Sequence, residues 1–374
     1  MLALPLQRGA VVDSTPLISF LKSRFGPGSD LEDKNDQRSL EKLRQHATAV
    51  TEASGDAGLD PLSYAIFQLR SLASRFSEYE DETKLLFSYQ DAFKPTKSII
   101  NRSIYYDLST FLWNSAALHS QIGSRVDRST DDGIRAANRH FQSAAGALDW
   151  ICSNCSQHMR DDGTLGPISV PVLRMMIMLM LAQAQLCFYE KAVRDRKAGL
   201  MKSVIVAKLA SQTSQFYRWS EGLSKQEICA SYIDASWSNH TDFQSKCFAA
   251  AAEYWQSQSA REDAQKNGSG YGEEIARLMR AAGLLKEAID FAILKKLGMS
   301  LTNGAAALQR TVETAKASAE NDNSKIYMEP IPPDHTIAAV SQVAMAKPLP
   351  FADYTGDLIE LGRIRCDTLS SAAC

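Results

Sequence analysis

The chain has 374 residues, of which 45% are hydrophobic and 22% are charged, a composition typical of soluble globular proteins. Its formal net charge of -2 leaves no excess of Lys and Arg for phosphate groups, which argues against a nucleic-acid-binding protein. The seven cysteines are irregularly spaced and the start, MLALPLQRGA, lacks a signal-peptide pattern, so we expect free thiols and a cytoplasmic location.

Helical patterning dominates the chain after the first few dozen residues. Thr15-Pro16 predicts a helix start, and Gly26-Pro27-Gly28 predicts its end. Further helices are expected over residues 34–54, 60–77, 104–124, 131–153, 170–193, 200–222, 226–265, 272–296 and 301–322. Sequence typical of β-strands occurs only in LALPL and AVV near the N-terminus. The expected fold is therefore all-α, with a small N-terminal β element.

The predicted helices place small residues within apolar faces, as in NSAALHSQIG (114–123), HFQSAAGALDW (140–150) and CFAAAAEYW (247–255). Alanine lets neighbouring helices approach closely. This pattern is typical of stacked helical hairpins of the tetratricopeptide kind, but the sequence has no strict repeat period. The most apolar segment, 174–189, is interrupted by Arg174, Gln183 and Gln185. A bilayer span needs about 20 largely apolar residues, so this segment predicts a buried helix.

The character of the sequence changes after Ser324, where prolines interrupt an apolar stretch that lacks the helical period. This predicts a tail over 325–350 that runs extended along the helices. We expect Ile326, Tyr327 and Ile331 to be its anchors, because an apolar segment of this kind is seldom disordered.

Two short motifs have the spacing of chemical sites. Cys152-Ser-Asn-Cys155 has CxxC spacing, but zinc requires a second pair and a thioredoxin motif requires a βαβ context, so we interpret the pair as structural. Glycines 268, 270 and 272 resemble a phosphate loop, but Glu273 and Glu274 follow where Gly-Lys-Ser/Thr would be required. That motif predicts a turn before a helix.

The remaining polar residues form no recognisable catalytic constellation. The six histidines include no HExxH pair, and the acidic clusters lie in polar segments typical of loops and helix caps. We therefore predict a protein that is not an enzyme and has no metal or cofactor. The basic run Arg194, Arg196, Lys197, Lys202 and Lys208 is either a solvated face or an electrostatic rim around a binding site.

The segment 202–217, KSVIVAKLASQTSQFY, has an unusually wide apolar arc for a helix. At about 100° per residue its apolar residues cover roughly 140°, against the roughly 100° that one core contact requires. One edge holds Ile205, Leu209 and Phe216, the adjacent edge holds Val206, Ala210 and Tyr217, and the opposite side holds Lys208, Ser211 and Gln215. The pattern alone leaves open whether all of the arc is buried or one edge docks a partner.

Six segments, in order, resemble the BRO-one domain family, which includes ALIX, HD-PTP and the rhophilins. They are 111–125 with 140–148, 181–192, 204–217, 271–288, 321–332 and 346–350. GEEIARL and the late Asp-Asn…Ile-Tyr…Pro element are individually distinctive. The resemblance covers nearly the whole chain and implies one domain over 1–360, with a tail over 361–374. It implies a boomerang-shaped helical domain with tetratricopeptide-like hairpins in its core.

The resemblance also implies a function and a binding site. Family members bind, on the concave face, the amphipathic C-terminal helix of an ESCRT-III subunit of the charged multivesicular body protein four type. Judged from the residues around them, Ile205 and Leu209 match the two aliphatic positions at the centre of the surface patch that binds this helix. Both are expected to be partly exposed. Lys202, Lys208 and Arg139 are assigned as flanking binding residues.

The function that these residues predict is a cytoplasmic adaptor that its ESCRT-III partner recruits to endosomal membranes. Other peptides are expected through the tail region. The alternative is a scaffold for another short peptide or a Rho-pathway partner, as in the rhophilins. The chain is about one helical turn longer than its relatives before Ile205. It contains none of the family's further domains, so it corresponds either to an excised domain or to a minimal member.

Overall fold

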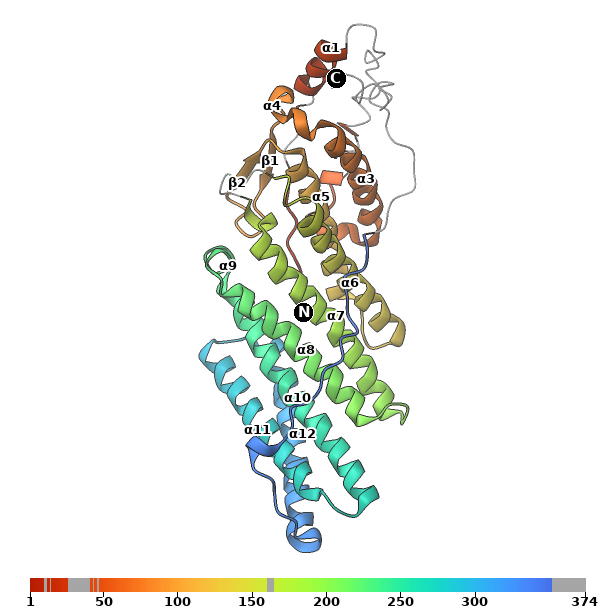
Figure 1. Cartoon of the computed structure of the whole chain (residues 1–374), viewed down its shortest axis with the longest axis vertical. Coiled ribbons are helices and arrows are strands. Elements are labelled where there is room, and N and C mark those ends of the chain that lie inside the picture. Colours follow the sequence, from red (N-terminus) through yellow and green to blue (C-terminus); the bar gives the residue numbers. More distant parts are fainter. Residues whose placement is uncertain are drawn as a thin grey trace. The chain divides into compact units, whose positions relative to one another are not determined.

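The computed structural model describes residues 1–9, 12–13, 15–25, 41–42, 44–45, 47–159 and 165–351 (Figure 1). The predicted helix stop at 26–28, most of the first half of the predicted helix 34–54 and the predicted tail 361–374 lie outside these residues. The chain divides into two compact units, described separately below. Unit 1 contains residue 1 with 126–142 and 175–348, and unit 2 contains 2–125, 143–174 and 349–374.

Unit 2 is built around the pair of helices α3 and α5. Its elements are α1 (Thr15–Phe25), η1 (Glu52–Gly58), α3 (Leu59–Phe76), η2 (Ser77–Tyr79), α4 (Glu80–Thr83), β1 (Phe87–Gln90), β2 (Ser98–Asn101), α5 (Ile104–Arg125), the second half of α6 (Asp131–Asn154), η3 (Gly166–Ile168) and the start of α7 (Val170–Lys197). Helix α3 packs on α5, which is buried along nearly its whole length. Strands β1 and β2 pair antiparallel, with Phe87 opposite Asn101.

The prediction of a strand in LALPL is wrong, because backbone groups in and next to this segment form hydrogen bonds with side chains of α5 instead of with another strand. The Leu4 N–H donates to Ser120 Oγ (2.8 Å), and the Gln7 N–H donates to Asn114 Oδ1 (2.7 Å). Gly9 forms an isolated bridge to Tyr89 of β1, and the Gln90 N–H donates to Arg8 O at 2.8 Å. Of AVV, only Val12 lies within the described residues, and it is not in a strand. The sheet of the described residues is instead the β1–β2 hairpin.

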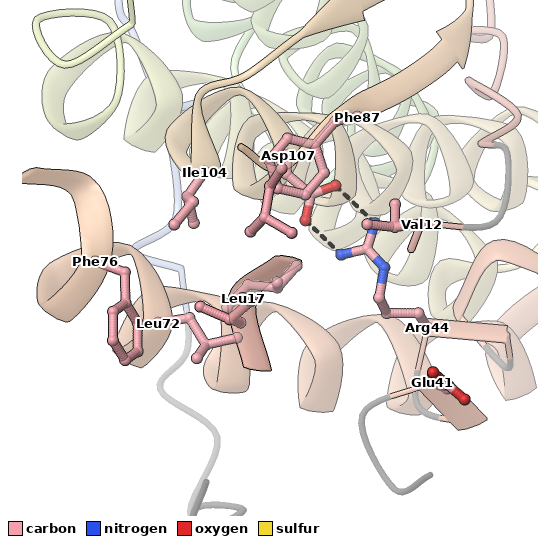
Figure 2. Close-up of a pocket in the computed structure, with 11 residues that line it drawn as sticks. Val12, Leu17, Glu41, Arg44, Leu72, Phe76, Phe87, Ile104 and Asp107 are labelled. Carbon is pink, nitrogen blue, oxygen red and sulfur yellow. Dashed lines mark hydrogen bonds and ion pairs between the residues drawn. The ribbon is translucent and has the colours of Figure 1, made fainter. Parts of the chain in front are cut away.

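The buried ion pair Arg44–Asp107 (Figure 2), together with a tyrosine hydroxyl, joins three separate segments of unit 2. The Arg44 guanidinium donates two hydrogen bonds to the Asp107 carboxylate, at 2.5 and 2.8 Å. The Tyr89 hydroxyl donates a third, to Asp107 Oδ1, at 2.5 Å. Burial raises the pKa of Tyr89 well above its usual value, so that the hydroxyl remains a donor. Both carboxylate oxygens are therefore satisfied in the core.

Unit 1 is a stack of antiparallel helices. It contains the rest of α7, then α8 (Ser203–Ser224), α9 (Glu227–Tyr232), α10 (Ala235–Asn267), α11 (Tyr271–Leu294), α12 (Met299–Asp322), η4 (Asn323–Tyr327) and η5 (Asp334–Thr336). Helix α10 packs against α8 on one side and α11 on the other, and α11 packs on α12. Ala250, Ala251 and Ala252 are buried, as the alanine-rich text predicted.

The predicted helix 226–265 is two helices, α9 and α10, with a break at Ile233–Asp234. Both residues have extended backbones, and the Asp234 side chain accepts a hydrogen bond from the Ser236 N–H. Aspartate is a strong N-cap, because its carboxylate satisfies a free N–H of the first turn. The break therefore has a local cause in the sequence.

Helix α7 contains the apolar run 174–189. By length and composition alone it meets the criteria for a membrane span, but 72% of its most apolar window is buried inside the protein. This agrees with the predicted buried helix. Gln183 and Gln185, which interrupt the apolar run, are fully buried.

After η4 the segment runs extended along the helices of unit 1, apart from the single turn η5, as predicted. The predicted start at residue 325 is three residues too early, because 325–327 belong to η4. The predicted anchors are wrong, however, because Ile326 and Ile331 are exposed and Tyr327 is at the edge of exposure. Of the three, Tyr327 has a clear ring contact, stacked on Tyr271 with 3.5 Å between ring centroids. Polar groups of the helices hold the segment instead, as described below.

Candidate functional site

Helix α8 buries one edge of its wide apolar arc completely. Val206, Ala210 and Tyr217, on the edge adjacent to Ile205 and Leu209, are all fully buried. On the other edge Ile205 is 36% exposed. The helix therefore offers Ile205 as an apolar group to a partner.

The prediction that Leu209 is partly exposed is wrong, because Leu209 is only 5% exposed. It belongs to a buried cluster with Ala192 and Val206, against which Trp255 and Val343 also pack. Trp255 comes from α10 and Val343 from the C-terminal segment. Leu209 is therefore a core residue one helical turn from Ile205.

The predicted basic run divides into paired and unpaired groups. Arg194 donates to Asp131 Oδ1 (2.6 Å), and Arg196 donates to Glu262 Oε1 (2.7 Å). Lys202, the exposed N-cap residue of α8, and the half-buried Lys208 make no ion pair with any residue that the structure describes.

Ile205 therefore has unpaired positive charge on both sides along the chain. Lys202 precedes it by three residues and Lys208 follows it by three. Arg139 is exposed but lies on α6, and within the described part of the chain its side chain makes no hydrogen bond to α8. Four of the five predicted residues therefore lie on α8 or at its N-cap, and the fifth, Arg139, lies on α6.

Sequence reasoning missed the residues that hold the C-terminal segment. The Gln185 side chain donates to Val343 O (2.9 Å) and accepts from the N–H groups of Met345 and Ala346, both at 3.0 Å. Gln142 accepts from the Lys347 N–H at 3.1 Å. A signal was present, because a glutamine inside an apolar helix is buried and must find a hydrogen-bond partner.

The glycine-rich turn before α11 binds a carboxylate of the same chain. Gly268 and Gly270 have positive φ, and α11 begins at Tyr271, as the interpretation of a turn before a helix predicted. The Glu329 carboxylate accepts from the Gly270 N–H at 2.9 Å, since a helix N-terminus favours a negative charge. A Cβ on Gly272 would lie 2.2 Å from Pro330 O, so glycine is required for this close approach.

The cysteine pair lies in a setting that suppresses thiol chemistry. Burial raises the pKa of Cys152 to about 11 and that of Cys155 to about 12, so both thiols are protonated at neutral pH. Among the described residues, no three His, Cys, Asp or Glu side chains are grouped as metal ligands.

Two concavities in unit 2 contain none of the predicted site residues. The cavity beside Arg44 and Asp107 is largely apolar and measures about 40 Å³ (Figure 2). Ligand pockets typically measure about 300–1,000 Å³, so this cavity is a packing space. An open groove of about 700 Å³ lies between α3 and the end of α6, where Arg70 lies over the ring of Trp150 at 5.1 Å.

The comparisons with known proteins agree on one family. The model of the BRO1-like domain matches residues 1–366. The chain belongs to the BRO1-like domain family. This confirms the family that the sequence segments indicated.

The curated relatives are longer proteins. ALG-2 interacting protein X of Dictyostelium discoideum is 27% identical over 94% of this chain and 43% of its own length. Vacuolar protein-sorting protein bro1 of Aspergillus fumigatus is 30% identical over 96% of this chain and 34% of its own length. The chain thus spans less than half the length of these relatives.

Solved structures share the fold. The chain matches the ALIX BRO1 domain in a complex with CHMP4C with a TM-score of 0.79 and 26% identity, covering 94% of this chain and 95% of that one. It also matches ALIX in complex with a SIVmac239 late domain, with a TM-score of 0.80, over 49% of that chain. The predicted all-helical fold class is therefore confirmed.

Proposed function

We propose that this BRO1-like domain is a non-enzymatic adaptor that binds the amphipathic C-terminal helix of an ESCRT-III subunit on the surface around Ile205. The observation that supports this most directly is the likeness to the ALIX BRO1 domain of the CHMP4C complex, over nearly the full length of both chains. The exposed Ile205 between two unpaired lysines gives this chain a surface suited to such a helix.

The contacts follow from the chemistry of the surface. An apolar position of the partner helix lies on Ile205, and acidic residues on its polar face lie near Lys202 and Lys208. Leu209 supports Ile205 from within the core and makes little direct contact. Arg139 is a further cation available to an acidic partner.

The exposure of Ile205 limits its share of the binding energy. Fully burying an isoleucine is worth roughly 1.5–3 kcal/mol, so the exposed third of its side chain contributes about 0.5–1 kcal/mol. A micromolar complex totals about 8 kcal/mol. Several contacts must therefore share the energy, and Ile205→Ala alone should weaken binding less than about tenfold.

Aspartate substitutions separate the surface residue from the core residue. Ile205→Asp should fold with a melting temperature near wild type and lose binding to the ESCRT-III peptide, because it places a desolvated charge against the partner's apolar residues. Leu209→Asp should unfold or strongly destabilise the domain, because it buries an unpaired charge. Full-strength binding by a folded Ile205→Asp variant would show that the partner docks elsewhere.

Charge reversal tests the lysines with a matched control on the same helix. Lys202→Glu combined with Lys208→Glu should weaken peptide binding and reduce its salt dependence. Arg218→Glu changes an exposed cation on the opposite side of α8 and should bind like wild type. Arg218→Glu changes the net charge by half as much as the double variant, so a loss of binding free energy in Arg218→Glu about half that of the double variant would indicate a general effect of net charge instead of a local site.

Through this partner the protein would be recruited from the cytoplasm to endosomal membranes. A panel of peptides tests the partner class. Selective binding of ESCRT-III C-terminal helices supports the proposal, whereas Ile205-dependent binding of an unrelated peptide or a Rho-pathway component would favour the scaffold alternative.

A further inference from the structure

The turn between α11 and α12 exposes three large apolar side chains. Ile293, Leu294 and Met299 are 71%, 74% and 77% exposed. Single exposed apolar residues are common on protein surfaces, but three within seven residues form a patch, and such patches mark interaction sites.

The backbone of this turn is ordered by hydrogen bonds. The Leu297 N–H donates to Ala292 O (2.9 Å) and the Lys296 N–H donates to Ile293 O (3.1 Å), the pattern of a Schellman motif. Lys296 has φ of 53°, a left-handed conformation that favours glycine. The chain therefore keeps a lysine where glycine would be less strained, and the apolar side chains project from a fixed turn.

The same turn is positively charged. Lys295 and Lys296 are both exposed and directly follow the apolar pair, and residues 291–312 contain no Asp or Glu. We name Ile293, Leu294, Lys295, Lys296 and Met299 the α11–α12 tip.

Neighbouring charges leave the tip net positive. On α10, Lys246 lies over the Phe291 ring with its Nζ 4.9 Å from the centroid, and it is paired with Asp242. Two acids on the preceding turns of α11, Glu287 and Asp290, are exposed to solvent. Lys286, on the same turns, is also exposed, so the last turns of α11 and the tip together hold three lysines against two acids, a net charge of +1.

We infer that the α11–α12 tip docks directly on an anionic membrane surface. A lipid interface provides an apolar boundary for the three aliphatic side chains and anionic headgroups for the two lysines, whose stems can lie along that boundary. A helix–helix turn is convex, so a lipid surface accommodates it without a matching pocket. Apolar insertion and charge attraction are the two signals that stable peripheral binding requires.

Vesicle co-sedimentation of the full chain, without any partner peptide, tests this inference. Vesicles of phosphatidylcholine containing phosphatidylserine at about one lipid in three should bind the protein, and pure phosphatidylcholine should bind it weakly. Each lysine contributes roughly a factor of five in affinity, so Lys295→Ala with Lys296→Gly should weaken binding about 30-fold. Glycine at 296 relieves the strained conformation, so this variant should remain folded.

Matched methionines test the apolar part. Met299→Ser should weaken binding to the phosphatidylserine vesicles, whereas Met328→Ser should not, although Met328 is 75% exposed, because Glu329 adjoins it. Equal effects of both, no binding to anionic vesicles, or wild-type binding by the lysine variant would overturn the inference. So would a tip-dependent dimer in size-exclusion chromatography, which would make the tip a self-association surface. The result is independent of peptide binding at Ile205.

Discussion

Replacing Gln185 with methionine tests whether this one side chain holds the C-terminal segment on unit 1. Methionine has a similar length and fills the buried space, but it removes three hydrogen bonds to the backbone of 343–346. At roughly 0.5–1.5 kcal/mol per bond, the loss amounts to about 1.5–4.5 kcal/mol. The lower part of this range applies if the segment detaches, because its backbone groups then bond to water.

Hydrogen exchange and chemical unfolding measure the effect. In Gln185→Met the amides of Met345 and Ala346 should exchange faster by at least about tenfold, and the free energy of unfolding should fall by at least about 1 kcal/mol. Ser211→Ala is the matched control, because it removes a single bond, to Val340 O at 3.1 Å. The reasoning is refuted if Gln185→Met leaves both amides as protected as in wild type, or if Ser211→Ala has the larger effect.

Two further predictions concern buried charge. Arg44→Met should lower the free energy of unfolding by about 3–5 kcal/mol in denaturant titrations, because it leaves the Asp107 carboxylate buried and unpaired. Adding Asp107→Asn should recover part of this loss, and no recovery would contradict the pairing. Burial lowers the pKa of His240 from 6.5 to about 4, so the unfolded chain binds a proton more readily and stability should fall by up to about 3 kcal/mol as the pH drops from about 6.5 to 4. His240→Gln should flatten this pH dependence, and an unchanged slope would assign it to other groups.

Much of the helical architecture is predictable from the sequence, because alanine-rich apolar faces specify helices and their packing sides locally. The break before α10 was missed although Asp234 is a recognisable N-cap, since the helical pattern continues on both sides of it. The burial of Leu209 could not be predicted from a helical wheel. It depends on Trp255 and Val343, which are remote in sequence and pack against its cluster.

The extended path of the C-terminal segment could be predicted, but its attachment could not. Prolines and the missing helical period indicate an extended chain, and apolar residues suggest apolar anchors. The apolar anchors are Val340 and Val343 instead of the predicted residues. The polar anchors are glutamine and glutamate side chains whose partners lie up to 205 residues away, from Gln142 to Lys347. The local sequence contains no information about hydrogen-bonded pairs of residues so far apart in the chain.

The attachment of the C-terminal segment also determines which positions tolerate substitution. Gln185 and Gln142 bind backbone N–H and C=O groups of 343–347, which every residue except proline supplies. Exchanging the exposed side chains of this segment should therefore leave it in place, but not Val343 or Ala346, which pack against the protein. Proline at 345, 346 or 347 removes a required donor. The information that fixes the path of the segment resides mainly in the helices beneath it, in glutamines encoded about 160–200 positions earlier.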